Sequence, residues 1–193
     1  MLGRMSMQAP ATRRSRLLRA AWQAPAGAVL LVLTVAALGG RVELLPMAYL
    51  AVVTPELCRI DAAEHRLPNA LVLPGLALAT AAPVLGWAAT GTPPTTALLA
   101  GAGTGVFLIV MHAAGGLGMG DVKLGTSLGL CLGCLGPVTV IAGPVIGFLA
   151  GGAAALVGLL VPSLGLGRRM PFGPFLLFGF WAAVVFQLTD QLG

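Results

Sequence analysis

Residues 138–161 read VTVIAGPVIGFLAGGAAALVGLLV and contain no charged side chain. A helix needs about 20 predominantly apolar residues to cross the hydrocarbon core of a bilayer. The whole chain of 193 residues is similar in character, with 58% hydrophobic and 9% charged residues. Soluble domains average about 25% charged residues, which they need to cover their surface. The sequence therefore predicts a membrane protein rather than a soluble domain.

Apolar segments recur along the chain. We read them at residues 26–40, 44–58, 70–89, 95–113, 122–136, 138–161 and 173–190, the first two being short. Backbone groups find no water partner in lipid, so spanning segments should be helices. The predicted fold is an all-α, polytopic transmembrane bundle of about seven spans. It would comprise a basic tail at residues 1–24 and one transmembrane domain at residues 25–193.

The basic residues indicate the orientation of this bundle. Five arginines lie within the first 24 residues, and no acid does. Positive residues favour the cytoplasmic side. A cytoplasmic tail places ten of the eleven basic residues on that side and only Arg41 opposite. Such a tail suits an anionic leaflet better than nucleic acid, so the bilayer is the expected partner.

The stretch TRRSRLL at residues 12–18 has a second interpretation, as a twin-arginine export signal. Export of that kind serves folded soluble cargo, whereas the rest of this chain is apolar. A basic tail that sets topology explains the arginines more simply.

Two carboxylates fall at the same predicted membrane face. Asp121 closes the run Gly118-Met119-Gly120-Asp121, and Asp61 opens the polar loop DAAEHRLPN that ends at Asn69. A carboxylate beside apolar sequence is costly and by default indicates function. Two carboxylates brought close in a low-dielectric site tend to share a proton. One can then act as general base and the other as general acid in peptide hydrolysis, with no metal or cofactor.

Three ordered motifs resemble those of bacterial type IV prepilin peptidases, which are intramembrane aspartic proteases of the GxGD kind. They are Asp61 with RLPN at residues 66–69, GMGDVKL at residues 118–124, and PFGPF at residues 171–175. The resemblance covers about residues 45–187 and implies catalytic roles for Asp61 and Asp121. It implies supporting or substrate-binding roles for further motif residues: Arg66, Pro68, Asn69, Gly118, Gly120, Lys123, Pro171 and Gly173.

The resemblance also implies substrates and a location. The substrates would be prepilin-like precursors with a short basic leader before an apolar helix. They would be cut at the cytoplasmic face of the bacterial inner membrane. Many members of the family carry an N-terminal part with two C-x-x-C pairs and N-methyltransferase activity. Nothing comparable is present here, so we do not expect methylation.

Other polar and small residues have structural interpretations. Glycines four residues apart, as at residues 125, 129 and 133, should form faces for close helix packing. Cys131 and Cys134 form a C-x-x-C inside an apolar segment, where ordinary packing is expected rather than zinc binding. His112 should be a satisfied interfacial histidine. Lys123 could either raise the local positive potential or reach the headgroups. Asn69 is expected to cap the helix that follows it.

A rival hypothesis is a small transporter that uses the two aspartates as a proton or cation relay. Transporter sites tend to lie near the bilayer midplane, whereas both aspartates are expected at one interface. Under the peptidase hypothesis, the helix dipoles predict which of the two aspartates holds the shared proton. Asp121 opens a helix and should be the ionised base, while Asp61 ends one and should be the protonated acid.

Overall fold

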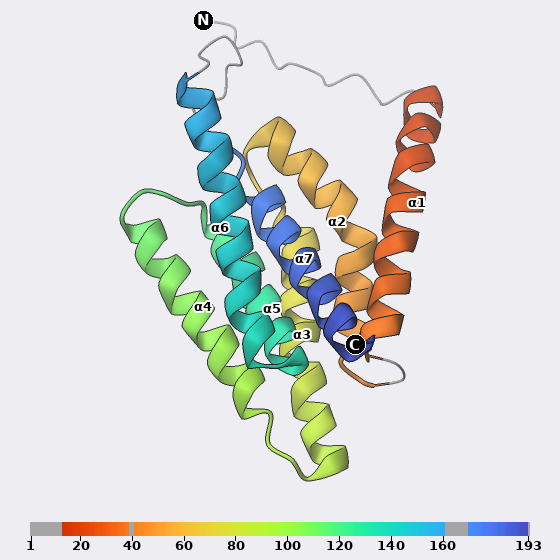
Figure 1. Cartoon of the computed structure of the whole chain (residues 1–193). Coiled ribbons are helices and arrows are strands. Elements are labelled where there is room, and N and C mark those ends of the chain that lie inside the picture. The colour runs from red at the N-terminus through yellow and green to blue at the C-terminus, as the bar shows by residue number, and fades with distance from the viewer. Residues whose placement is uncertain (1–12, 39–40, 161–169, 193) are drawn as a thin grey trace, which may run out of the picture.

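The computed structural model describes residues 13–38, 41–160 and 170–192 and shows a bundle of helices (Figure 1). In the described residues the elements are α1 (Arg13–Leu38), α2 (Leu44–Glu64), α3 (Asn69–Thr90), α4 (Thr95–Ala113), α5 (Met119–Leu135), α6 (Pro137–Leu160) and α7 (Gly173–Leu192). None of these residues lies in a strand. The all-α class is confirmed.

Each apolar segment predicted from the sequence falls on one of these helices. The segment predicted at residues 95–113 coincides with α4. Two helices are longer than expected. α1 begins at Arg13 and so includes part of the predicted basic tail, of which residues 1–12 lie outside the described residues. α2 continues past residue 58 to Glu64, which places Asp61 in its last turn.

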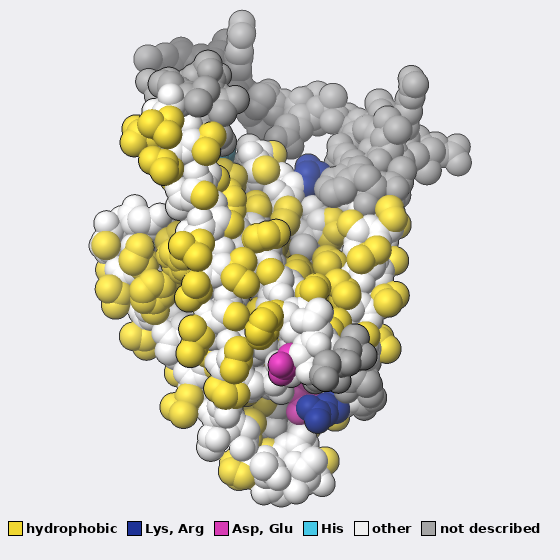
Figure 2. All heavy atoms as spheres, viewed as in Figure 1, with side chains coloured by type: hydrophobic (Ala, Val, Ile, Leu, Met, Phe, Trp, Pro, Cys, Tyr) yellow, Lys and Arg dark blue, Asp and Glu magenta, His cyan; other side chains and the backbone are white. Residues whose placement is uncertain are grey.

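The surface of the bundle is apolar in the way a lipid environment requires. Among the described residues, α3, α4, α6 and residues Gly173–Asp190 of α7 are long and apolar enough to cross a membrane. A shorter apolar stretch, Gln23–Ala36, lies in α1. Figure 2 shows hydrophobic side chains over much of the visible face, with the charged side chains in view toward the two ends. The chain is a helical membrane bundle, and about seven spans remains the prediction.

α5 is the centre of this bundle. It packs against α3, α4, α6 and α7, and most of its side chains are buried. Its central place requires small residues, because helices in lipid associate by close packing rather than by hydrophobic exclusion. A Cβ at Gly133 would meet the Cα atom of Ala97 on α4, and one at Gly179 on α7 would meet the carbonyl oxygen of Gly143 on α6. The predicted packing role of the spaced glycines is confirmed.

Two hydrogen bonds fix α2 within the bundle. Trp181 Nε1 of α7 donates to Thr54 Oγ1 of α2 over 3.1 Å. The Tyr49 hydroxyl of α2 donates to the Leu71 carbonyl oxygen of α3 over 2.8 Å. α2 is thereby held against both α3 and α7.

The contact at Gly133 yields a stability prediction. We expect Gly133→Ala to lower the melting temperature of the purified protein in detergent, because the new methyl group forces α4 away from α5. Overpacking of this kind typically costs about 1–3 kcal/mol. Gly152→Ala on α6 is the matched control, since a Cβ there meets no atom within 4 Å. Equal melting temperatures for the two variants would contradict the packing described here.

Candidate active site

Asp61 and Asp121 line one pocket at one end of the bundle. Asp61 belongs to the last turn of α2 and Asp121 to the first turn of α5. The pocket has a volume of about 470 Å³ and is also lined by residues of the 115–118 loop and by residues 170–172. The two side chains are 3% and 8% exposed, respectively. The structure thus brings Asp61 and Asp121 to one face, as predicted, and residues of all three motifs line the same cavity.

The Asp61 carboxylate is held by the start of another helix. The backbone N–H of Gly173, the first residue of α7, donates to Asp61 Oδ2 over 2.9 Å. A helix N-terminus carries a partial positive charge that favours an anion. A Cβ at Gly173 would lie only 2.9 Å from the same oxygen, so the close approach depends on glycine. Sequence reasoning placed Gly173 ahead of the last span and missed this contact.

The Asp121 carboxylate is satisfied on one oxygen only. Its Oδ2 accepts a hydrogen bond from the Gly118 N–H over 3.1 Å, at the start of the same helix. Its Oδ1 is buried and has no hydrogen-bond partner. An unpartnered buried oxygen is costly when the carboxylate is charged. Protonation of Asp121 relieves that cost.

The electrostatics of the pair follow from this geometry. Both aspartates lie outside the spans predicted at residues 44–58 and 122–136. Burial, followed by the negative charge of Asp61, raises the pKa of Asp121 to about 6, although the Gly118 N–H opposes the rise. Burial also raises the pKa of Asp61, against the opposing effects of the Gly173 N–H and of His65.

This arrangement argues against the proton assignment expected from the sequence. That assignment gave the proton to Asp61 because Asp61 ends α2. It did not include α7, whose N-terminus faces Asp61 and offsets the unfavourable end of α2. Asp121 has the unpartnered oxygen and the strongly raised pKa, so it is the better candidate for the protonated member.

The loop before Asp121 is closed by a histidine. The ring Nδ1 of His112, in the last turn of α4, lies 2.7 Å from the Leu117 carbonyl oxygen. Gly115 supplies the turn with a φ of 81°, a conformation that favours glycine. His112 is exposed and engaged with the backbone, so it is satisfied as predicted, and its place at the membrane interface stays a prediction.

Leu67 and Asn69 contact the first residues of α5, the helix that carries Asp121. Leu67 lies against Gly120, where an added Cβ would come within 2.9 Å of Leu67 Cβ. The N-cap of α3 is Pro68 rather than Asn69, so the predicted capping role of Asn69 is wrong. Asn69 Oδ1 instead accepts a hydrogen bond from Lys123 Nζ over 2.9 Å. This bond joins the starts of α3 and α5.

The pocket gathers some motif residues and leaves others outside. Gly118 and Pro171 line it, while Arg66 is exposed and does not. His65 also lines the pocket, in the left-handed conformation with a φ of 52°. Sequence reasoning did not select His65, because a lone histidine in a polar loop carries no signal of its own.

Metal-binding groups are sparse in the described part of the chain, which has no cluster of three His, Cys, Asp or Glu side chains. Cys58, Cys131 and Cys134 are free thiols. Cys131 is buried in the core, and Cys134 lines a pocket that also includes Arg41 rather than the pocket with the aspartates.

Comparisons with known proteins bear on the whole arrangement. No solved structure matches the chain. The prepilin leader peptidase/N-methyltransferase of Pseudomonas putida is 33% identical over 157 residues, which are 76% of this chain and 51% of that protein. The chain thus spans about half the length of this relative. Residues 48–161, which hold Asp61 and Asp121, match the model of the type IV leader peptidase family. The chain belongs to the type IV leader peptidase family.

Proposed function

We propose that this protein is an aspartic endopeptidase that removes the leader from type IV prepilin-like precursors. The observation that carries the proposal is the pair of buried carboxylates, Asp61 and Asp121, lining one pocket in a chain of this family. The name of the P. putida relative supports the same substrate class. The proposal covers peptide hydrolysis alone, because two carboxylates supply general acid and general base chemistry.

The hydrogen bonds support one assignment of the two roles. Asp61, held by the N-terminus of α7, is the ionised base that takes a proton from water as the water oxygen attacks the peptide carbonyl carbon. In the active form of the pair Asp121 is protonated, and it donates to the carbonyl oxygen as negative charge develops there. When the C–N bond breaks, the proton on Asp61 passes to the leaving amine, and a hydroxyl proton of the intermediate returns to Asp121. Both carboxyl groups then have their starting protonation states.

The reaction would occur at the membrane surface. The pocket lies at the end of the bundle where the exposed Arg66 and the half-buried Lys123 are found. By the positive-inside rule that end is cytoplasmic. The protein would be a multi-pass component of the bacterial inner membrane, with the basic leader of the precursor reaching the aspartates from the cytoplasm.

The substrate backbone must open before it can be cut, since a peptide bond within a helix is hydrogen-bonded and shielded. Gly115, Gly116 and Gly118 are exposed in the loop that borders the pocket. Without side chains they leave the substrate backbone room to approach the carboxylates. We place the local opening of the substrate helix at this loop.

The catalytic roles are tested by coexpressing the protein with a prepilin-like precursor and following leader removal on a gel. Asp61→Asn and Asp121→Asn should each lower processing by at least about 10²-fold, because each removes one partner in proton transfer. Glu64→Gln is the control, an exposed carboxylate near Asp61 that does not line the pocket. Processing that survives in both aspartate variants would overturn the mechanism. Proton flux that depends on these residues, without cleavage, would favour the relay hypothesis.

The proton assignment is tested by infrared titration of the carboxyl C=O band. In the wild-type protein Asp121 should lose its proton at about pH 6. In Asp61→Asn its pKa should fall, since removing the Asp61 charge makes the ionised form of Asp121 less costly. An unchanged or higher pKa in that variant would show that the two carboxylates do not interact.

Gly173→Ala tests whether the hydrogen bond from the Gly173 N–H positions the Asp61 carboxylate. The added methyl group would lie 2.9 Å from Asp61 Oδ2 and should displace the carboxylate from the Gly173 N–H. We expect kcat to fall by about 10-fold or more with a small change in KM, the pattern of a misplaced catalytic group. Gly152→Ala is again the control. A variant with full kcat would show that this hydrogen bond does not position the base.

A further inference from the structure

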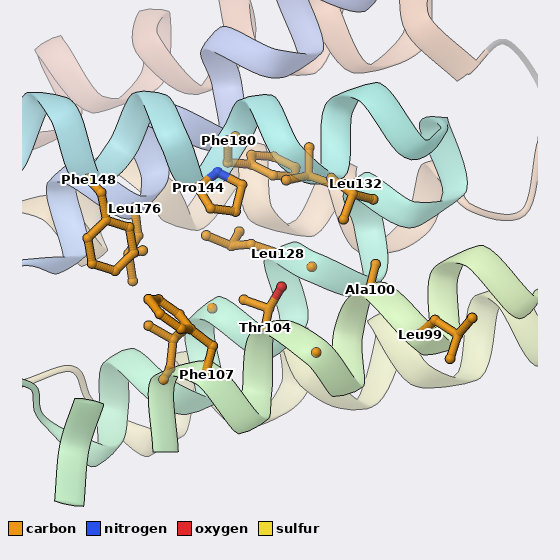
Figure 3. A pocket seen from close by; sticks show the side chains of 16 residues that line it. Leu99, Ala100, Thr104, Phe107, Leu128, Leu132, Pro144, Phe148, Leu176 and Phe180 are labelled. Carbon is orange, nitrogen blue, oxygen red and sulfur yellow. The ribbon is translucent and has the colours of Figure 1, made fainter. Parts of the chain in front are cut away.

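An apolar groove lies between α4 and α6, beside the proposed active site (Figure 3). Its volume is about 280 Å³, and no charged side chain lines it. The groove exists because α4 packs mainly on α5 and α6 mainly on α7, while α4 and α6 make few contacts with each other. Leu128 of α5 and Leu176 of α7 form part of its wall.

One end of the groove lies near the pocket that holds the carboxylates. Phe107 of α4 and Phe148 of α6 face each other across it, with ring centroids 5.4 Å apart. The next ring is Phe172, whose centroid is 5.0 Å from that of Phe148. Phe172 also lines the pocket with Asp61 and Asp121. A continuous row of aromatic rings therefore joins the groove to the site.

The groove runs from this end toward the far end of the bundle and opens to the side. On α4 it is lined from Phe107 back to Leu99, which is away from the loop that leads to Asp121. Residues 99–108 of α4 span about 14 Å of helix. Leu99 is 73% exposed, and Gly103 between these two residues is exposed as well. A Cβ added at Gly103 would meet no atom within 4 Å, so the groove is unfilled at its middle.

We propose that this groove binds the apolar segment that immediately follows the scissile bond of the precursor. The inference rests on the proposed function and identifies where that site receives its substrate. A volume of about 280 Å³ takes a few apolar side chains rather than a whole helix.

The position of the groove near the carboxylate pocket selects this occupant. A peptide cut between Asp61 and Asp121 has its basic leader at the membrane surface and its apolar part directed into the bilayer. The groove starts at Phe148, whose ring neighbours Phe172 of the carboxylate pocket, and runs toward the far end of the bundle. Apolar segments in lipid associate by close packing against small residues, and Gly103 supplies such a surface. A lipid acyl chain would match the apolar lining but has no reason to end at the carboxylates.

Filling the groove is the first test. Gly103→Phe should place a ring in the groove, because a Cβ there meets no atom within 4 Å. Gly152→Phe adds the same ring on α6, where a Cβ is equally free of neighbours but lies outside the groove. In detergent with a purified precursor, we expect Gly103→Phe to lower kcat/KM by about 10-fold, mainly through KM. Gly152→Phe should resemble the wild type. Equal kcat/KM for the two variants would overturn the proposal.

Photo-crosslinking is the second test and does not depend on cleavage. Benzoyl-phenylalanine replaces either Phe107, which lines the groove, or Ile109, which does not, in an Asp61→Asn background that retains the precursor. The two sites lie on one helix and are 49% and 50% exposed. We expect the precursor to crosslink at position 107, through residues just after the scissile bond, and far less at position 109.

Crosslinking of position 107 to phospholipid alone, or equal yields of precursor adduct at the two positions, would overturn the groove assignment. The proposed function fails differently. If the wild-type protein does not cut the precursor, or Asp61→Asn cuts it as well as the wild type, the peptidase proposal falls and the groove proposal with it. Normal cleavage together with equal activity of the two phenylalanine variants would overturn the groove alone.

Discussion

The hydrogen bond from the Gly173 N–H to Asp61 joins two segments 112 residues apart in the chain. Asp61 is 3% exposed, and a carboxylate so buried is costly to ionise unless donors compensate for the lost water. The N-terminus of α7 supplies that compensation at the end of α2, where the dipole of α2 itself is unfavourable. The position of α7 thus favours the ionised state of Asp61, and the packing of α7 on its neighbours maintains that position.

Close helix packing maintains this position. α7 lies on α6 through the contact of Gly179 with Gly143, and on α2 through the Trp181 to Thr54 hydrogen bond. α5 brings Asp121 from the other side and packs on α4 through Gly133. The glycine contacts set the separation of the packed helices. Because these helices position Asp61 and Asp121, the glycine contacts also affect where the two carboxylates lie. The same pairing of α4 with α5 and α6 with α7 leaves α4 and α6 apart and creates the groove.

Much of this could be predicted from the sequence. Apolar length located every helix, and the alternation of basic residues predicted that Asp61 and Asp121 share one face. What the sequence missed depends on residues distant in the chain. The dipole argument for the proton treated Asp61 and Asp121 as ends of their own helices, whereas the deciding partner of Asp61 is α7. The Lys123 to Asn69 bond and the row from Phe107 to Phe172 were missed for the same reason: local spacing says nothing about which helices become neighbours.

The two carboxylates differ in how freely their surroundings can adjust. Asp61 is fixed by a helix start that cannot move without displacing α7 from α6. Asp121 follows a loop with three exposed glycines, closed by the contact between His112 and the Leu117 carbonyl oxygen. Under the proposed function, a substrate backbone that enters the pocket would displace the loop more readily than α7. The buried Oδ1 of Asp121, which has no partner in the free protein, is then the atom with hydrogen-bonding capacity to offer the incoming peptide. Under the proposed function, a substrate carbonyl would accept a hydrogen bond from Asp121 when Asp121 is protonated.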